Sequence, residues 1–150
     1  MIEPRLDNST TQALPAHDLG EAERATVKEK WEGAVTAGSG FVAVPMALLR
    51  LQSKYELSPT DMMVLINLMA HWWEPKQVVY PRSTTIAARM GVDKRTVQRS
   101  LHKLQKLRLV DREILPDGKR AINFAPLVAR LTRDLPAAYV AHSRETHGDF

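Results

Sequence analysis

The turn around Gly91 constrains the fold of this chain most, because it separates two short predicted helices. The first is STTIAARM (83–90), which carries apolar residues along one helical face. Gly91 follows it, where a left-handed backbone conformation costs least. Asp93 is then placed to cap a second helix, KRTVQRSLHKLQK (94–106), by accepting a hydrogen bond from the amide of Thr96. We therefore expect two helices joined by a tight turn.

The second predicted helix has an apolar seam and an opposite basic face. Val97, Leu101 and Leu104 recur at i, i+4 and i+7, which places them on one side of the helix. The residues that face directly away are Arg95, Arg99, His102 and Lys106, flanked by Gln98 and Lys103. A helix that is only solvated usually mixes charges of both signs, yet residues 94–106 contain no acid. We interpret this face as a surface for a polyanion.

Another helix precedes this pair and a β-hairpin follows it. Residues 57–73 have apolar residues at helical spacing, with Ser58 as the cap and Asp61 placed to reach back to it. Residues 109–115 and 120–127 read as strands around a PDGK turn. Three helices followed by a hairpin are the element order of a winged helix, a mainly α fold with a small β-hairpin (α+β). Further predicted elements are a small strand at 41–45, a helix at 45–54 and a last helix at 125–135.

The stretch VYPRSTTIAARMGVDKRTVQRSLHKLQKLRLV resembles the winged helix-turn-helix domains of bacterial regulators. The matching residues are Tyr80-Pro81, Ile86-Ala87, Met90-Gly91-Val92, Arg95-Thr96-Val97-Gln98-Arg99, Leu101, Leu104 and Leu109-Val110. The preceding FVAVPMALL and LSPTDMMVLINL resemble the subset found in plasmid and phage replication proteins and in small mobile-element regulators. The resemblance covers about residues 41–115. Two residues depart from the pattern: Asp93 replaces the usual Ser cap, and Arg108 replaces the usual glycine, which predicts a differently shaped turn before the first wing strand.

The resemblance implies that the N-terminal half of the second helix enters the major groove of DNA. The expected base contacts are Arg95, Thr96, Gln98 and Arg99, since Arg can donate in a fork to guanine and Gln can pair with adenine. The expected phosphate contacts are Ser83, Thr84, Thr85, Lys94, His102, Lys103 and Lys106. Ser83 and Thr84 are also candidate caps of the first helix. Lys119 and Arg120 form the expected contacts of the wing.

Charge is uneven along the 150-residue chain, whose formal net charge is +4. Residues 41–133 hold 16 Lys and Arg against 7 Asp and Glu, whereas both ends are acidic. We expect a flexible acidic N-terminal tail at 1–40, a winged helix-turn-helix DNA-binding domain at 41–135 and a C-terminal tail at 136–150. A helix at 21–35 within the first tail could be ordered by a partner.

Signals of an enzyme are absent from the sequence. The chain has no cysteine, and its five histidines show no metal-ligand spacing. TAGSG (36–40) follows no strand and precedes no lysine, so it is not a phosphate loop. We expect no catalytic activity, no cofactor and no metal. Because no signal peptide and no apolar run of spanning length is visible, we expect a cytoplasmic, nucleoid-associated protein without membrane contact.

The sequence favours a sequence-specific double-stranded DNA-binding protein, a transcriptional regulator that represses a bacterial or mobile-element operon. We expect a homodimer on an inverted repeat, with the tails open to a protein partner. Three dimer surfaces remain open: the helix at 21–35, the helix at 45–54 and the C-terminal helix near Leu127, Val128 and Leu131. An alternative is a plasmid or phage replication or maintenance accessory protein that binds repeated origin or partition-site DNA. A third is a winged helix that contacts only other proteins.

Overall fold

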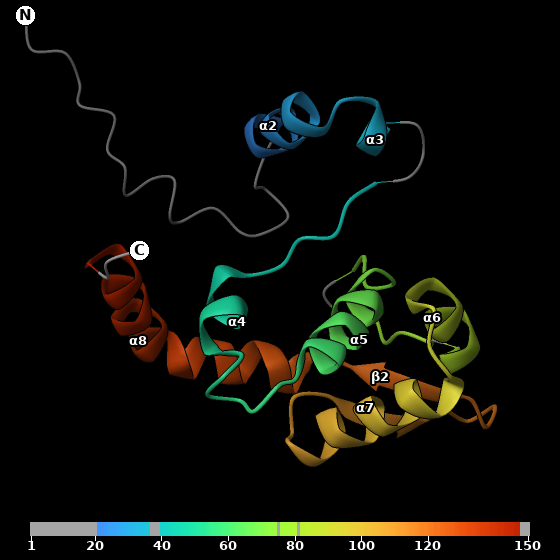
Figure 1. The fold of residues 1–150 in the computed structure, drawn as a ribbon. Helices are drawn as coiled ribbons and strands as arrows, with labels where there is room; N and C mark the ends of the chain where they lie inside the picture. Colours follow the sequence, from blue (N-terminus) through green and yellow to red (C-terminus); the bar gives the residue numbers. More distant parts are fainter. Residues whose placement is uncertain (1–20, 37–39, 75, 81, 148–150) are drawn as a thin grey trace, which may run out of the picture. The chain divides into compact units, whose positions relative to one another are not determined.

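The computed structural model describes residues 21–36, 40–74, 76–80 and 82–147 (Figure 1). The chain divides after Phe41 into two units, which we describe separately. The first unit contains α2 (Glu21–Trp31) and α3 (Gly33–Thr36). Helix α2 lies within the helix predicted at 21–35, and α3 ends one residue beyond it. Residues 1–20 of the tail predicted at 1–40, and the middle of the TAGSG segment, lie outside the described residues.

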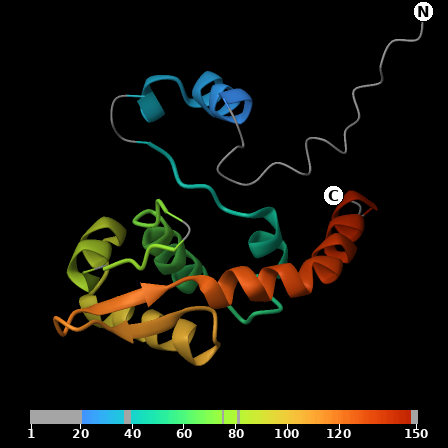
Figure 2. The same cartoon turned by 180° about the vertical axis from the view of Figure 1, so that it is seen from behind.

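The second unit contains a winged helix, so the expected mainly α fold with a small β-hairpin is confirmed. Its elements in chain order are α4 (Met46–Leu51), α5 (Pro59–Met69), α6 (Ser83–Met90), α7 (Lys94–Lys106), β1 (Asp111–Ile114), β2 (Arg120–Asn123) and α8 (Ala125–His147). Helices α6 and α7 both pack against α5. The hairpin follows α7, and Figure 2 shows α8 continuing from the hairpin and running past α4. The core beneath these elements includes the fully buried Leu65, Ile86, Val97, Leu104 and Phe124.

The start of α5 is the capping box that the sequence predicts. The Asp61 amide donates to Ser58 Oγ at 3.1 Å, and the Ser58 amide donates to Asp61 Oδ2 at 2.9 Å. Pro59 occupies the first turn, where its missing N–H costs nothing. These two bonds satisfy amides that the helix itself cannot pair.

The turn between α6 and α7 also follows the prediction, with two differences in its caps. Gly91 adopts φ 64°, the left-handed conformation that ends α6. The Asp93 side chain accepts from the amide of Arg95 at 3.2 Å, whereas the Thr96 amide donates to the Asp93 backbone oxygen. The residue before α6 is Arg82, which makes no side-chain bond to the helix, so the proposed caps at its start are wrong. The first amides of α6 are therefore not capped by a side chain.

The hairpin is shorter than predicted and gains an unexpected third partner. Strands β1 and β2 pair antiparallel, with Arg112 opposite Ile122 and Ile114 opposite Arg120. Val79 forms an isolated bridge to Ile122, through backbone bonds of 2.9 and 2.8 Å. The small strand predicted at 41–45 does not form, and those residues are irregular. Two reasons explain why this strand does not form. Val79 pairs with β2, and the proline that follows residues 41–44 has no amide to donate to a strand partner.

Helix α8 is longer than the helix predicted at 125–135. It continues through Pro136 to His147, and Leu127, Leu131 and Ala138 attach it to the core. A proline inside a helix normally interrupts it, because the ring removes one hydrogen bond and clashes with the preceding turn. Here packing on both sides of Pro136 outweighs that cost. Residues 148–150 of the predicted C-terminal tail lie outside the described residues, and the three-part division of the chain stays a prediction.

Arg108 keeps the turn before β1 in the left-handed conformation that glycine favours, at φ 56°. The differently shaped turn expected from this substitution is therefore absent.

A residue with a side chain loses about 1–2 kcal/mol of stability when it adopts the left-handed conformation. Glycine avoids this cost, but its greater freedom in the unfolded chain offsets part of the gain. We expect Arg108→Gly to raise the free energy of unfolding by about 0.5–1 kcal/mol, measured by urea denaturation. Lys106→Gly, at a helical position, is the control and should lower it; a destabilised Arg108→Gly would contradict the strain.

Candidate nucleic-acid interface

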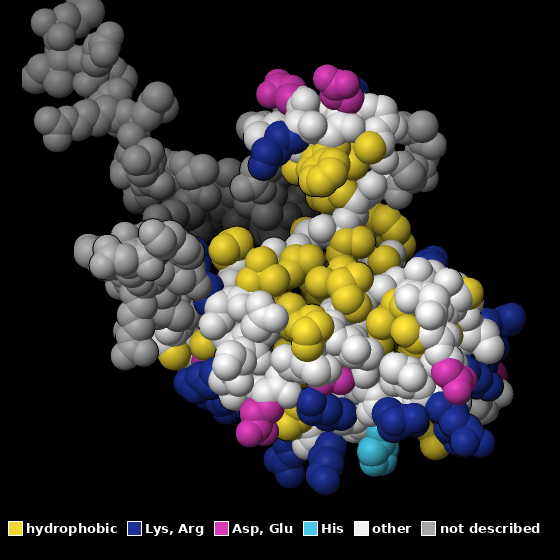
Figure 3. Space-filling view, viewed as in Figure 1, with side chains coloured by type: hydrophobic (Ala, Val, Ile, Leu, Met, Phe, Trp, Pro, Cys, Tyr) yellow, Lys and Arg dark blue, Asp and Glu magenta, His cyan; other side chains and the backbone are white. Residues whose placement is uncertain are grey.

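Helix α7 presents the predicted apolar seam to the core and the predicted basic face to solvent. Val97, Leu101 and Leu104 are buried, at no more than 3% exposed. On the opposite side, a shallow hollow of about 340 Å³ is lined by Arg95, Gln98, Arg99 and His102. All four of these side chains are exposed. Figure 3 shows Lys and Arg side chains along the lower edge of the domain, where Figure 1 places α7 and the hairpin.

Asp61 connects the start of α5 to the middle of α7. Its carboxylate accepts from Ser100 Oγ at 2.8 Å and from Lys103 Nζ at 2.5 Å, in addition to the capping bond from Ser58. Burial disfavours the charged carboxylate and would raise the pKa of Asp61, but the bonds from Lys103, Ser58 and Ser100 outweigh burial and lower that pKa. Lys103 therefore has a partner inside the domain that the sequence analysis did not predict.

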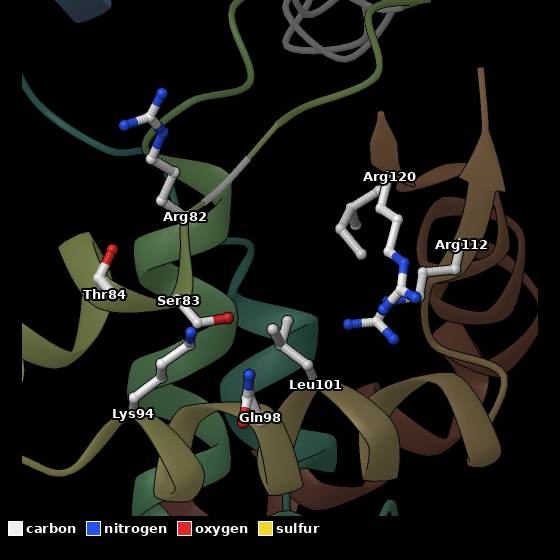
Figure 4. Close-up of a pocket in the computed structure, with 9 residues that line it drawn as sticks. Arg82, Ser83, Thr84, Lys94, Gln98, Leu101, Arg112 and Arg120 are labelled. Atoms are coloured by element: carbon white, nitrogen blue, oxygen red, sulfur yellow. The ribbon is translucent and has the colours of Figure 1, made fainter. Parts of the chain in front are cut away.

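A second hollow, of about 310 Å³, lies between the start of α6, one side of α7 and the hairpin (Figure 4). It is lined by Arg82, Ser83, Thr84, Lys94, Gln98, Leu101, Arg112, Arg120 and Ile122. The structure thus brings together residues predicted separately on two helices and the wing. Gln98 lines both hollows, so the two adjoin along α7.

Sequence reasoning missed two basic residues of this second hollow, Arg82 and Arg112. Arg82 directly precedes α6, outside the helical spacing on which the sequence prediction rests. Arg112 faces the hollow because the strand register places it beside Arg120 on one face of the hairpin. The alternation of strand DREI, combined with the PDGK turn, is the signal that could have identified Arg112.

The remaining predicted contacts lie outside both hollows. Thr85 and Lys106 are exposed, and Thr96 is half-buried. At the wing tip, Lys119 Nζ lies 3.6 Å from Asp117 Oδ2, and its side chain is 71% exposed. None of these residues lines either hollow.

The last turn of α7 is attached to α8 by a cluster around Tyr55. Arg130 donates to the backbone oxygen of Leu107, and its guanidinium lies 4.6 Å from the centre of the Tyr55 ring. The Tyr55 hydroxyl donates to Asp134 Oδ2 at 2.7 Å. Burial, followed by the bond to Asp134, raises the pKa of Tyr55 to about 12. The cluster therefore holds the C-terminal end of α7, whereas Asp93 caps its N-terminal end.

This cluster predicts a loss of stability at alkaline pH. Because the pKa of Tyr55 is higher in the folded chain, its protonated hydroxyl stabilises the fold at pH values below the unfolded pKa of about 10. This stabilisation is lost as the pH rises from about 10 to about 12. We expect Tyr55→Phe to lower the free energy of unfolding at pH 7 by about 1 kcal/mol, and to lose less stability than wild type between pH 9 and pH 11. Urea denaturation at several pH values measures both effects. Tyr139→Phe, at an exposed site, is the control, and parallel pH profiles for wild type and Tyr55→Phe would contradict the assignment.

The described residues show no sign of a metal site or of a membrane span. No group of three His, Asp or Glu side chains among them is arranged to hold a metal ion. No helix in the described part of the chain is long and apolar enough to cross a membrane. The side chains of residues 142–147, which include two of the five histidines, are outside this statement.

Comparison with known proteins finds a match for the central part of the second unit. Residues 55–110, which contain α5, α6 and α7, match the family described as a helix-turn-helix domain. No curated protein matches the sequence. Among solved structures, the chain is similar to a transcriptional regulator of the MarR family from Silicibacter pomeroyi, with 24% sequence identity and a TM-score of 0.39. That similarity covers 69% of this chain and 67% of the other.

Proposed function

We propose that this protein binds double-stranded DNA in a sequence-specific manner and represses transcription of a bacterial or mobile-element operon. The match of residues 55–110 to the family described as a helix-turn-helix domain supports the proposal. The observation that carries the proposal is the exposed face of α7, which presents Arg95, Gln98, Arg99 and His102 together. Helix α7 contains no acid, and its opposite side is buried in the core. Such a face suits the major groove, which admits one helix.

In this proposal Arg95, Gln98 and Arg99 contact base edges. The two guanidinium groups can each donate two hydrogen bonds to guanine, and the amide of Gln98 can pair with adenine. Thr96, being half-buried, supplies at most a contact from the edge of the helix. His102 and Lys106 follow further along α7 and contact phosphate, which fixes the position of the protein without reading sequence. Lys119 contacts the backbone from the wing tip. Lys103 is not among the proposed DNA contacts, because it forms an ion pair with Asp61.

We further propose a homodimer that binds an inverted repeat through two copies of this surface. A single winged domain makes few base contacts, and pairing two raises both affinity and site length. All three dimer surfaces considered expose apolar side chains: Trp31 on α2, Met46 and Leu49 on α4, and three residues on the C-terminal helix. Leu127 and Leu131 are buried in the core, whereas Val128, Leu135 and Tyr139 are exposed on α8. Nothing in the structure or the comparisons favours the replication or maintenance role.

The test of this proposal is the selection of bound sequences from a random duplex pool, followed by titration of the selected duplex. We expect an inverted repeat, since its symmetry reflects the dimer. We also expect affinity to fall steeply between 50 and 200 mM salt, by about 0.9 logarithmic unit per logarithmic unit of salt for each neutralised phosphate. Absence of duplex binding, or an affinity that does not depend on salt, would support the reading in which the domain contacts only proteins.

A further inference from the structure

The hollow between α6, α7 and the hairpin gathers positive charge from three elements. Arg82, Lys94, Arg112 and Arg120 line it, and no acidic residue does. Figure 4 shows Arg112 and Arg120 extending from the hairpin toward the same point, with Lys94 and Gln98 rising from α7 below. The hydroxyl of Ser83 points into the same space from the start of α6, whereas Thr84 and Arg82 point away at the rim. The space is therefore surrounded by donors and cations.

These cations have no partner inside the described part of the chain. Neither an ion pair nor a side-chain hydrogen bond is formed there by Lys94, Arg112 or Arg120, in contrast to Lys103 and Arg133, which pair with carboxylates. The strand register places Arg112 and Arg120 as diagonal neighbours on one face of the hairpin. Diagonal neighbours are within reach of long side chains, so the two like charges repel each other. An anion between them would replace repulsion by attraction.

We infer that this hollow binds one phosphate of the DNA backbone, held between the hairpin arginines and the start of α6. A phosphate offers several oxygens, and an arginine can donate two parallel hydrogen bonds to them. The N-cap residue of α6, Arg82, makes no side-chain cap bond, and the N-terminus of a helix favours an anion. Leu101 and Ile122 also line the hollow, and both are buried, so part of its lining is apolar.

The position of Gln98 favours a phosphate that belongs to bound DNA. Gln98 lines both this hollow and the outer face of α7. A strand whose base edges meet Arg95 and Arg99 therefore has its backbone next to the hollow. The inference rests on the proposed function, and it adds Arg112 from the strand itself to the wing-tip residues Lys119 and Arg120. The hairpin then holds the DNA strand along its face as well as at its tip.

The test compares the full-length protein with the double variant Arg112→Gln and Arg120→Gln on the selected duplex. We expect affinity to fall roughly 10- to 100-fold, which is the loss of a hydrogen-bonded contact to a charged group. The salt slope should decrease by about 0.9, the contribution of one phosphate. The control removes the same two charges by Lys54→Gln and Arg133→Gln, which lie away from both hollows. It should change affinity far less and leave the slope within about 0.3 of wild type.

A duplex with single neutral methylphosphonate linkages locates the phosphate. One position in each half-site should weaken wild type and leave the double variant unaffected, because that contact is already lost. Thermal unfolding in phosphate-free buffer verifies folding, and the double variant should melt at or above the wild-type temperature, since repulsion is removed. If wild type binds DNA but the double variant binds equally well with the same slope, the inference is wrong while the proposed function stands.

Inorganic pyrophosphate distinguishes a free phosphate compound from the DNA backbone. Millimolar pyrophosphate should compete with the duplex for wild type, and the double variant should be less sensitive. If pyrophosphate raises the melting temperature of wild type alone, while DNA affinity is the same in both proteins, the hollow binds a free phosphate compound and the inference is overturned. If wild type does not bind duplex DNA at all, both the proposed function and this inference fail.

Discussion

Replacing Asp61 by alanine is expected to lower the free energy of unfolding by about 2–3 kcal/mol. One carboxylate supplies the capping bond of α5 and the bonds to Ser100 and Lys103 on α7. Loss of the bond from the Ser58 amide costs about 1 kcal/mol, while Ser58 Oγ can still accept from the backbone amide of residue 61. The hydroxyl of Ser100, which is only 4% exposed, is left without its partner and adds about 1–2 kcal/mol. Urea denaturation of the variant at pH 7 measures the sum.

Two further variants separate the parts of this loss. Ser58→Ala removes the cap but leaves the bonds to α7, so it should cost only about 1 kcal/mol. Lys103→Met leaves a buried carboxylate without its cation, and the double variant with Asp61→Ala should cost less than the two single losses added together. If Asp61→Ala is no more destabilising than Ser58→Ala, the link to α7 contributes nothing.

The lowered pKa of Asp61 also predicts how stability depends on pH. A carboxylate whose pKa is lower in the folded chain stabilises the fold above its ordinary value of 3.8. This stability is lost as pH falls below 3.8 through the pKa of the folded state. Wild type should therefore lose more stability than Asp61→Asn on acidification, because the variant has no charge to lose at that position.

The part of the fold that the sequence predicts best is the part determined by local signals. Helices α6 and α7 span Ser83–Met90 and Lys94–Lys106, the predicted ranges, because Gly91 and Asp93 mark their ends. The bridge from Val79 to β2 escaped prediction, since it requires knowing which strand edge is free. The continuation of α8 beyond 135 escaped for a related reason: Pro136 signals a break locally, whereas Ala138 packs on a core that the rest of the chain builds.

The candidate site also has a part that local sequence signals predict and a part that depends on the packed fold. Periodicity alone places Arg95, Gln98 and Arg99 on the outer face of α7, because the seam of Val97, Leu101 and Leu104 determines the rotation of the helix. The ion pair of Lys103 with Asp61 could not be predicted, since it joins residues from two helices at a distance set by their packing. The same holds for the hollow, because only the folded domain places Lys94 and the hairpin arginines around one space.

Arg99→Ala is expected to remove most of the discrimination between the selected duplex and a scrambled one. A side chain that donates twice to guanine contributes about 1–3 kcal/mol of discrimination, or about 5- to 150-fold in the ratio of affinities. Arg99 is exposed on α7 and lines the outer hollow beside Arg95 and Gln98. Its removal should leave stability nearly unchanged, because it is outside the core. Fluorescence anisotropy on both duplexes at one salt concentration measures the ratio.

Lys119→Ala is the matched comparison, because a contact to phosphate carries no sequence information. It should weaken binding to both duplexes about equally and flatten the salt slope. Arg99→Ala should instead weaken binding mainly to the selected duplex, so the two variants separate base reading from backbone attraction. A wild-type ratio of affinities in Arg99→Ala would mean that α7 does not read bases through this residue. The discrimination would then have to come from Arg95 and Gln98 on the same face, or from the energy of deforming the DNA.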